Sequence, residues 1–322
     1  MVTRYLLLIV ILLGAFLRFY GITWGLPYTF HAGEHLLVIK QALKLEYNFF
    51  CNHSLNPEYS SYGTLPLYIF LFVKWIYFKI FYFFNGNIGP IKTFFNGDFS
   101  DYLKTFYSYE KTPEKIYMPT LFLIGRTISA FFGSISIYLI FSFAKKLFNS
   151  SVGILSALFF ALTVGLIQSS HFFTVDTMLI CFMLFTLICG ADILKKGDFK
   201  YYIFAGLSLG LALSVKLTSL ILILPLLVAH LLSENRNSHR LNLRNIFSKE
   251  FITFNTVAIS LYLFLNPYSI LDFKSYLGSS DSVTALGNLF SFYRSKIFDW
   301  NDWRFSYNGT IPYWYQDRKS VV

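Results

Sequence analysis

Ionisable side chains stand at the edges of several long apolar runs in this sequence. Glu34 follows the first run, Asp176 opens a later one, and Lys216 lies between two others. Because a charged group at membrane depth is costly, such residues are functional candidates by default. A carboxylate can remove a proton from an attacking hydroxyl, and an ammonium group can stabilise a developing phosphate charge. These residues therefore predict acid–base or anion-stabilising chemistry at a membrane boundary.

One of these acids also lies in a His-x-x-Glu-His motif, formed by His31, Glu34 and His35. On a helix this spacing places two imidazoles on one face for zinc, with the glutamate as general base. Gly33 disfavours a helix here by about 1 kcal/mol, and Pro27 lies only one turn upstream. No downstream acidic motif supplies the third ligand. A membrane zinc protease is therefore kept only as an alternative, which stoichiometric zinc in the purified protein would support.

The composition indicates which kind of protein positions these residues. Of the 322 residues, 55% are hydrophobic, 20% are aromatic and 14% are charged, whereas about a quarter of an average soluble domain is charged. The apolar residues form long blocks, which is typical of membrane proteins. Many of the cations behind the net charge of +10 lie in short loops. Membrane orientation and anionic lipid phosphate explain that charge, and we expect a lipid bilayer but no nucleic acid as partner.

A membrane span needs about 20 mostly apolar residues. The candidates are 4–24, 119–143, 152–170, 174–194, 201–216, 217–232 and 251–268. We read the first as an uncleaved span, since no cleavage site with small residues follows it. A further apolar stretch, 64–84, carries Lys74 and Lys79 in its middle. These segments predict one all-α transmembrane domain over 1–322.

The distribution of cations predicts the orientation of the spans. If 64–84 lies on the outer surface without crossing, the loop cations fall on the cytoplasmic side: Arg4, Lys145, Lys146, Lys195, Lys196, Lys200, Arg236, Arg240, Arg244 and Lys249. The N-terminus is then cytoplasmic. The outer side receives the loop 25–117, with interfacial helices at 34–46 and 64–84, and an external tail at 269–322. The candidate site residues consequently share the outer face.

Four segments in order resemble motifs of one membrane enzyme family. The first is 26–35, Leu-Pro-Tyr-Thr-Phe-His-Ala-Gly-Glu-His, and the second is 170–176, Ser-His-Phe-Phe-Thr-Val-Asp. The third is Gly-Leu-x-x-x-x-Lys-x-Thr around Lys216, and the fourth is 309–316, Gly-Thr-Ile-Pro-Tyr-Trp-Tyr-Gln. Together they resemble the GT-C-type glycosyltransferases that use polyprenyl- or dolichyl-phosphate sugars, related to protein O-mannosyltransferases and aminoarabinose transferases. The resemblance extends from Leu17 to Gln316.

The resemblance implies a multi-span helical bundle that transfers a sugar from a lipid phosphate to a hydroxyl acceptor on the outer face. It implies catalytic positions at Gly33, Glu34 and Asp176. The donor phosphate would be bound by Lys216 and Arg18, and the acceptor or other substrate groups by His31, His171, Tyr307, Tyr313 and Gln316. The resemblance implies no certain cofactor and leaves a divalent cation open. The membrane would be the plasma membrane in a prokaryote and the endoplasmic reticulum in a eukaryote; the sugar and acceptor stay open.

Two departures from the family pattern bear on activity. The family has an acidic pair where this sequence has Gly33 and Glu34, so the first acid is missing. Family members also continue for further spans, and the residues after Gln316 resemble a truncated end. We therefore expect weak transfer. The alternative is a non-catalytic member of the fold that binds a lipid or a partner protein.

Each candidate residue also has a purely structural interpretation. For Glu34 it is an acid in the first turn of helix 34–46, where the helix dipole favours a negative charge. For Asp176 and Thr174 it is the role of N-cap residues of the fourth span. Lys216 at a helix end can extend its ammonium group toward water. His171 lies in an aromatic turn, where an interfacial histidine is common. The tertiary structure must decide which of these residues meet.

Overall fold

A computed structural model of the chain describes residues 2–26, 34, 38–57, 62–85, 118–233 and 247–273. All regular elements in these ranges are helical, so the expected all-α class is confirmed. The chain forms two compact units. Unit 1 contains 1–22, 62–66 and 126–273, and unit 2 contains 23–61, 67–125 and 274–322. Each unit is described by itself below.

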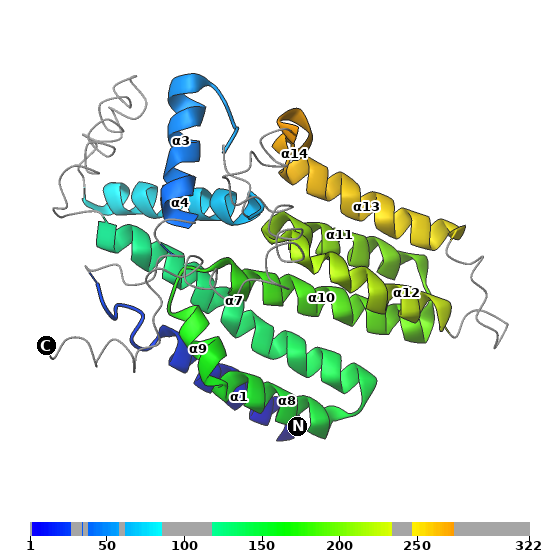
Figure 1. The fold of residues 1–322 in the computed structure, drawn as a ribbon. Helices are drawn as coiled ribbons and strands as arrows, with labels where there is room; N and C mark the ends of the chain where they lie inside the picture. The colour runs from blue at the N-terminus through cyan, green and yellow to red at the C-terminus, as the bar shows by residue number, and fades with distance from the viewer. Residues whose placement is uncertain are drawn as a thin grey trace, which may run out of the picture. The chain divides into compact units, whose positions relative to one another are not determined.

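Unit 1 is a bundle of apolar helices that run along one another (Figure 1). Its described elements, in chain order, are α1 Val2–Phe19, α7 Met118–Leu147 from Arg126 onward, α8 Ser150–Leu162, α9 Val164–Ser170, α10 Val175–Lys196, α11 Phe199–Val215, the 3-10 helix η2 Leu217–Leu222, α12 Ile223–Leu231, α13 Lys249–Leu265 and α14 Tyr268–Leu271.

The larger core of unit 1 lies among α10, α11, α12 and α13. Two glycines of α11 allow α13 to approach closely: a Cβ at Gly206 would lie 2.7 Å from the Phe254 carbonyl oxygen, and one at Gly210 would lie 2.9 Å from that of Ala258. Three polar side chains from α11, α12 and the start of α13 also contact one another in series. The Tyr202 hydroxyl lies 2.6 Å from Nδ1 of His230. The other ring nitrogen of that histidine lies 3.2 Å from the hydroxyl of Ser248, which caps α13.

A second core joins α1, α7 and α8. It contains Val10, Ile137, Phe141, Ala157 and Ala161. The start of α8 is set by Asn149, whose side chain accepts a hydrogen bond of 2.9 Å from the Val152 backbone N–H. Such a cap satisfies a backbone donor that a helix start leaves unpaired.

The observed helices differ in detail from the expected spans. α1 ends at Phe19, and the chain then turns through Gly21 and Gly25, both at positive φ. The expected span 152–170 is broken at Thr163 into α8 and α9, which are bent by 59°. The expected span 217–232 begins with the 3-10 helix η2.

Unit 2 contains the described helices α3 Lys40–Asn52 and, from Leu67 onward, α4 Leu65–Asn85. The Lys74 ammonium forms an ion pair with the Glu46 carboxylate, and the lysine is buried with 4% of its surface exposed. Lys79 instead lies 3.8 Å above the ring of Trp75. The helix expected at 34–46 corresponds to α3, which ends at Asn52, six residues later than expected. His53 caps α3 in a left-handed conformation.

Membrane character follows from length and hydropathy. Among the described residues, Pro119–Leu147 and Val175–Lys196 are long and apolar enough to cross a membrane, and the bent pair α8 and α9 qualifies if it counts as one span. Phe199–Val215 and Leu217–Leu231 are shorter apolar helices. Large apolar side chains also cover the outside of unit 1, for example Leu12 at 60% exposed and Phe159 at 64% exposed. The chain is an integral membrane protein; the complete set of seven crossings stays a prediction.

Candidate active site

The structure brings together two of the predicted site residues, Asp176 and Lys216. The Lys216 ammonium nitrogen lies 3.4 Å from a carboxylate oxygen of Asp176. Asp176 is in the first turn of α10, where a negative charge is favoured by the helix dipole. Lys216 follows the last residue of α11 in an extended conformation, with φ −156° and ψ 125°. This break in the helix places the two charges side by side.

Residues 62–64 of unit 1 lie beside Lys216 and the end of α11. The Lys216 ammonium lies 5.5 Å from the centre of the Tyr62 ring, within the range of a cation–π contact. The backbone N–H of Gly63 donates a 3.0 Å hydrogen bond to the Val215 carbonyl. A Cβ at Gly63 would lie 1.9 Å from the Ser214 carbonyl oxygen, so only glycine fits there. We call residues 62–64 the strap.

The strap is also tied to the end of α13. The Thr64 backbone N–H donates a 2.9 Å hydrogen bond to the side-chain oxygen of Asn266. The Thr64 hydroxyl contacts the backbone carbonyl of Leu265 and lies 3.0 Å from the same Asn266 oxygen. The strap thus joins the ends of α11 and α13 next to the start of α10. Sequence reasoning did not find this role for Thr64.

Two hydroxyl groups beside Asp176 are buried without a hydrogen-bond partner in the described part of the chain. They are Oγ1 of Thr174 and Oγ1 of Thr177. The Thr174 side chain does not cap α10, contrary to the structural interpretation of that residue. Buried polar groups are usually satisfied, so these two hydroxyls are exceptions among the described residues.

Arg18 is fully buried, and its guanidinium binds backbone carbonyls beside the bend between α8 and α9. Its guanidinium donates to the carbonyls of Gly14 at 2.9 Å, Ala161 at 3.2 Å and Phe160 at 3.2 Å. These carbonyls include the last ones of α8, which the bend leaves without helical partners. A phosphate would have to compete with them, so donor binding by Arg18 stays a prediction that these contacts do not favour.

His171 and Arg126 contact the chain at the C-terminal end of α1, the same end at which Arg18 lies. A ring nitrogen of His171 lies 3.0 Å from the Leu17 carbonyl oxygen. Arg126 is buried, donates a 2.9 Å hydrogen bond to the Ile22 carbonyl, and lies 5.3 Å from the centre of the Phe172 ring. Sequence reasoning did not single out Arg126, although an arginine inside the apolar run 119–143 was a signal that could have found it.

The remaining predicted residues do not belong to the described part of unit 1. Glu34 is fully buried in unit 2. The other candidates lie outside the described residues: His31, Gly33, Tyr307, Tyr313 and Gln316. The two histidines of the zinc motif lie outside them as well. Among the described residues, no three His, Cys, Asp or Glu side chains are grouped to hold a metal ion.

Comparison with known proteins finds one family that part of the chain resembles. Residues 121–265 match the family model described as dolichyl-phosphate-mannose-protein mannosyltransferase. No curated protein and no solved structure matches the chain. The matched region contains every described element from α8 to α13 in full, and with them both Asp176 and Lys216. With the all-helical membrane fold, this match over slightly less than half of the chain supports a GT-C-type glycosyltransferase similar to the protein mannosyltransferases.

Proposed function

We propose that the protein transfers a sugar from a polyprenyl- or dolichyl-phosphate donor to a hydroxyl acceptor at the face of the membrane where Asp176 and Lys216 meet. The observation that carries the proposal is the 3.4 Å ion pair between these residues, inside the region that matches the mannosyltransferase family. By the distribution of loop cations, this face is the outer one. The membrane is the plasma membrane in a prokaryote or the endoplasmic reticulum in a eukaryote.

Lys216 is suited to the leaving group of this reaction. When the bond between sugar and phosphate breaks, negative charge grows on the lipid phosphate, and a fixed cation lowers the barrier. The Lys216 side chain is 32% exposed, and its partner Asp176 is 52% exposed. A water-exposed pair of this kind is weak. The ammonium can therefore turn from the carboxylate to a phosphate oxygen at little cost.

The acceptor hydroxyl needs a base, because an alcohol is a poor nucleophile. The family resemblance assigns this role to an acidic pair at Gly33 and Glu34, of which only Glu34 has a side-chain carboxylate. Asp176 is a second carboxylate that could orient the acceptor or a divalent cation. With one acid of the pair missing, we expect slow transfer. A member of the fold that binds the donor without turning it over is the alternative.

Donor consumption in proteoliposomes tests the proposal without knowledge of the acceptor. The full chain would be supplied with radiolabelled polyprenyl-phosphate mannose, together with hydroxyl acceptors of peptide and lipid type. Release of free polyprenyl phosphate and of labelled product would be measured. Lys216→Gln should lower the rate by roughly 10²- to 10³-fold, as loss of a charge-stabilising group does.

The matched control is Lys249→Gln, which removes an exposed lysine at the first position of α13. It should leave the rate unchanged. Donor that binds the wild-type protein but is never consumed would favour the non-catalytic alternative. Equal rates for Lys216→Gln and wild type would contradict the role of Lys216.

A further inference from the structure

We propose that a cluster of lysines at one end of unit 1 binds the phosphate headgroup of an anionic phospholipid. The cluster lies where α7 and α10 end and α11 begins. Its members, called the lysine cluster here, are Lys145, Lys146, Lys195, Lys196 and Lys200.

The structure places the lysine cluster at the edge of the membrane. The two described helices that are long and apolar enough to cross, Pro119–Leu147 and Val175–Lys196, both end in it. Exposed apolar side chains lie next to it along the chain, including Phe148 at 70% and Phe199 at 49% exposed. Lysine and aromatic side chains at the ends of spans are typical of the level where lipid headgroups lie. A headgroup phosphate is therefore within reach of these ammonium groups.

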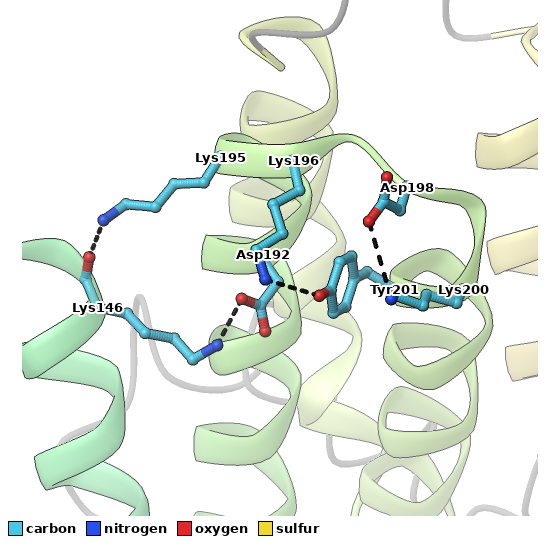
Figure 2. Close-up of polar contacts among 7 residues, drawn as sticks. All are labelled: Lys146, Asp192, Lys195, Lys196, Asp198, Lys200 and Tyr201. Atoms are coloured by element: carbon cyan, nitrogen blue, oxygen red, sulfur yellow. Dashed lines mark hydrogen bonds and ion pairs between the residues drawn. The ribbon is translucent and has the colours of Figure 1, made fainter.

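Two of the lysines are held in place by contacts between α7 and α10 (Figure 2). Asp192, which is only 8% exposed, forms an ion pair with Lys146. The Lys195 ammonium, on α10, donates a hydrogen bond to the backbone carbonyl of Lys146, in the last turn of α7. A cation there also complements the negative end of the helix dipole. The ends of both helices are thereby fixed to each other.

The other side of the cluster is organised around Tyr201, in the first turn of α11. The Lys196 ammonium donates a 3.0 Å hydrogen bond to the Tyr201 hydroxyl. The Lys196 and Lys200 ammonium groups lie 5.3 Å and 5.2 Å from the centre of the Tyr201 ring. Gly197, at φ 65°, makes the tight turn between the two helices. The turn brings these lysines from two helices around one aromatic ring (Figure 2).

The charges of the cluster do not cancel. The five lysines of the cluster share their segments with two carboxylates, Asp192 and Asp198, which leaves a net charge of +3. Asp192 is shielded from water and engaged with Lys146. The second pair, Lys200 with Asp198, has an N–O distance of 3.9 Å and side chains that are 63% and 47% exposed. A pair this exposed is weak, so an anionic phosphate can replace the carboxylate.

A lipid is a better fit than a free phosphate because the site combines cations with adjoining apolar surface. The headgroup would bind the ammonium groups, while the acyl chains would continue along the apolar helix surfaces. Each lysine near an anionic surface contributes roughly a fivefold factor in binding. Three lysines together should therefore change the affinity by about 100-fold.

The test uses the full chain in a zwitterionic detergent, titrated with phosphatidylglycerol and followed by native mass spectrometry. The triple variant Lys195→Gln/Lys196→Gln/Lys200→Gln should bind phosphatidylglycerol about 100-fold more weakly than wild type. The corresponding triple Arg variant should bind within a few fold, because it keeps the charge. Lys79→Gln, a lysine of α4 outside the cluster, should bind as wild type does.

Three results would overturn the proposal. The triple Gln variant could retain full affinity, phosphatidylcholine could bind as tightly as phosphatidylglycerol, or glycerol 3-phosphate at equal concentration could displace the lipid. The last result would assign the cluster to a free phosphate compound. If the triple Gln variant proves unstable, the affinity of the wild type for phosphatidylglycerol is measured at increasing salt concentration. Binding through charge must weaken as salt is added, so an affinity that does not change with salt would also overturn the proposal. Micelles have no inner and outer side, so these measurements separate lipid binding from the effect of lysines on membrane orientation.

Discussion

The ammonium nitrogen of Lys216 lies 3.4 Å from the Asp176 carboxylate, although 40 positions separate the two residues in sequence. They meet because α10 begins where α11 ends. An exposed pair at this distance contributes about 0–1 kcal/mol to stability. The pair therefore adds little to stability. Its position is better explained by a site that presents the Lys216 ammonium to a phosphate.

This relationship predicts a separation between activity and stability. Asp176→Asn should reduce donor consumption by roughly 10²-fold, because the carboxylate proposed to orient the acceptor is lost. The free energy of unfolding should change by at most about 1 kcal/mol. Thermal unfolding in detergent and the proteoliposome assay measure the two quantities. Asp198→Asn, which alters the exposed pair with Lys200, should affect neither; a large loss of stability in Asp176→Asn would indicate a structural role instead.

Gly63 provides a test of the strap. In Gly63→Ala the added Cβ would lie 1.9 Å from the Ser214 carbonyl oxygen, so the backbone of the strap must move. We expect a loss of about 1–3 kcal/mol in stability and reduced donor consumption, since Tyr62 would shift away from Lys216. Gly165→Ala is the matched control, because a Cβ at Gly165 has no atom within 4 Å. Equal melting temperatures for the two variants would show that the strap does not need this close approach.

The buried pair of Lys74 and Glu46 predicts strong coupling between α3 and α4. Lys74→Met alone leaves the Glu46 carboxylate, which is 13% exposed, without its ammonium partner. Breaking a buried pair in this way typically costs about 3–5 kcal/mol. The double variant Lys74→Met/Glu46→Leu should be more stable than either single variant, because no charge stays unpaired. Additive losses in thermal unfolding would contradict the coupling.

A substitution at position 33 tests whether the missing acid limits the transfer rate. Gly33→Asp restores the acidic pair of the family and should raise the transfer rate by about 10²- to 10⁴-fold, the usual contribution of acid–base catalysis. The neighbouring Glu34 does not replace it on a helix, since adjacent residues point about 100° apart. The comparison needs both chains in the same proteoliposome assay. A wild-type rate as high as that of Gly33→Asp would show that position 33 needs no acid.

Membrane orientation is a separate prediction. Cysteines placed at Ser108 and Ser238, which both lie outside the described residues, should react with an impermeant reagent from opposite sides of an intact membrane. The reason is the gathering of loop cations on one side when 64–84 does not cross. Labelling of both positions from one side would overturn this orientation, and with it the outer location of the proposed site.

The sequence by itself determined the class of this protein. Long apolar blocks with few charges leave a membrane helix as the favourable arrangement, because every backbone N–H and carbonyl must be paired inside lipid. The short motif around Asp176 and the lysine in Gly-Leu-x-x-x-x-Lys-x-Thr indicated the family, which the match over 121–265 bears out. Hydropathy also located most helices to within a few residues, since that property is local.

Only the tertiary structure decided what each polar residue contacts. Lys74 suggested a helix lying on the membrane surface, which stays a prediction, and only the structure shows that its ammonium is paired with the Glu46 carboxylate on α3. Arg18 had suggested phosphate binding, but the bend at Thr163 exposes carbonyls that the guanidinium satisfies. The close approach of Gly63 to Ser214 has no signal in either segment alone. Such contacts join residues far apart in sequence, so they depend on how the helices pack and not on local pattern.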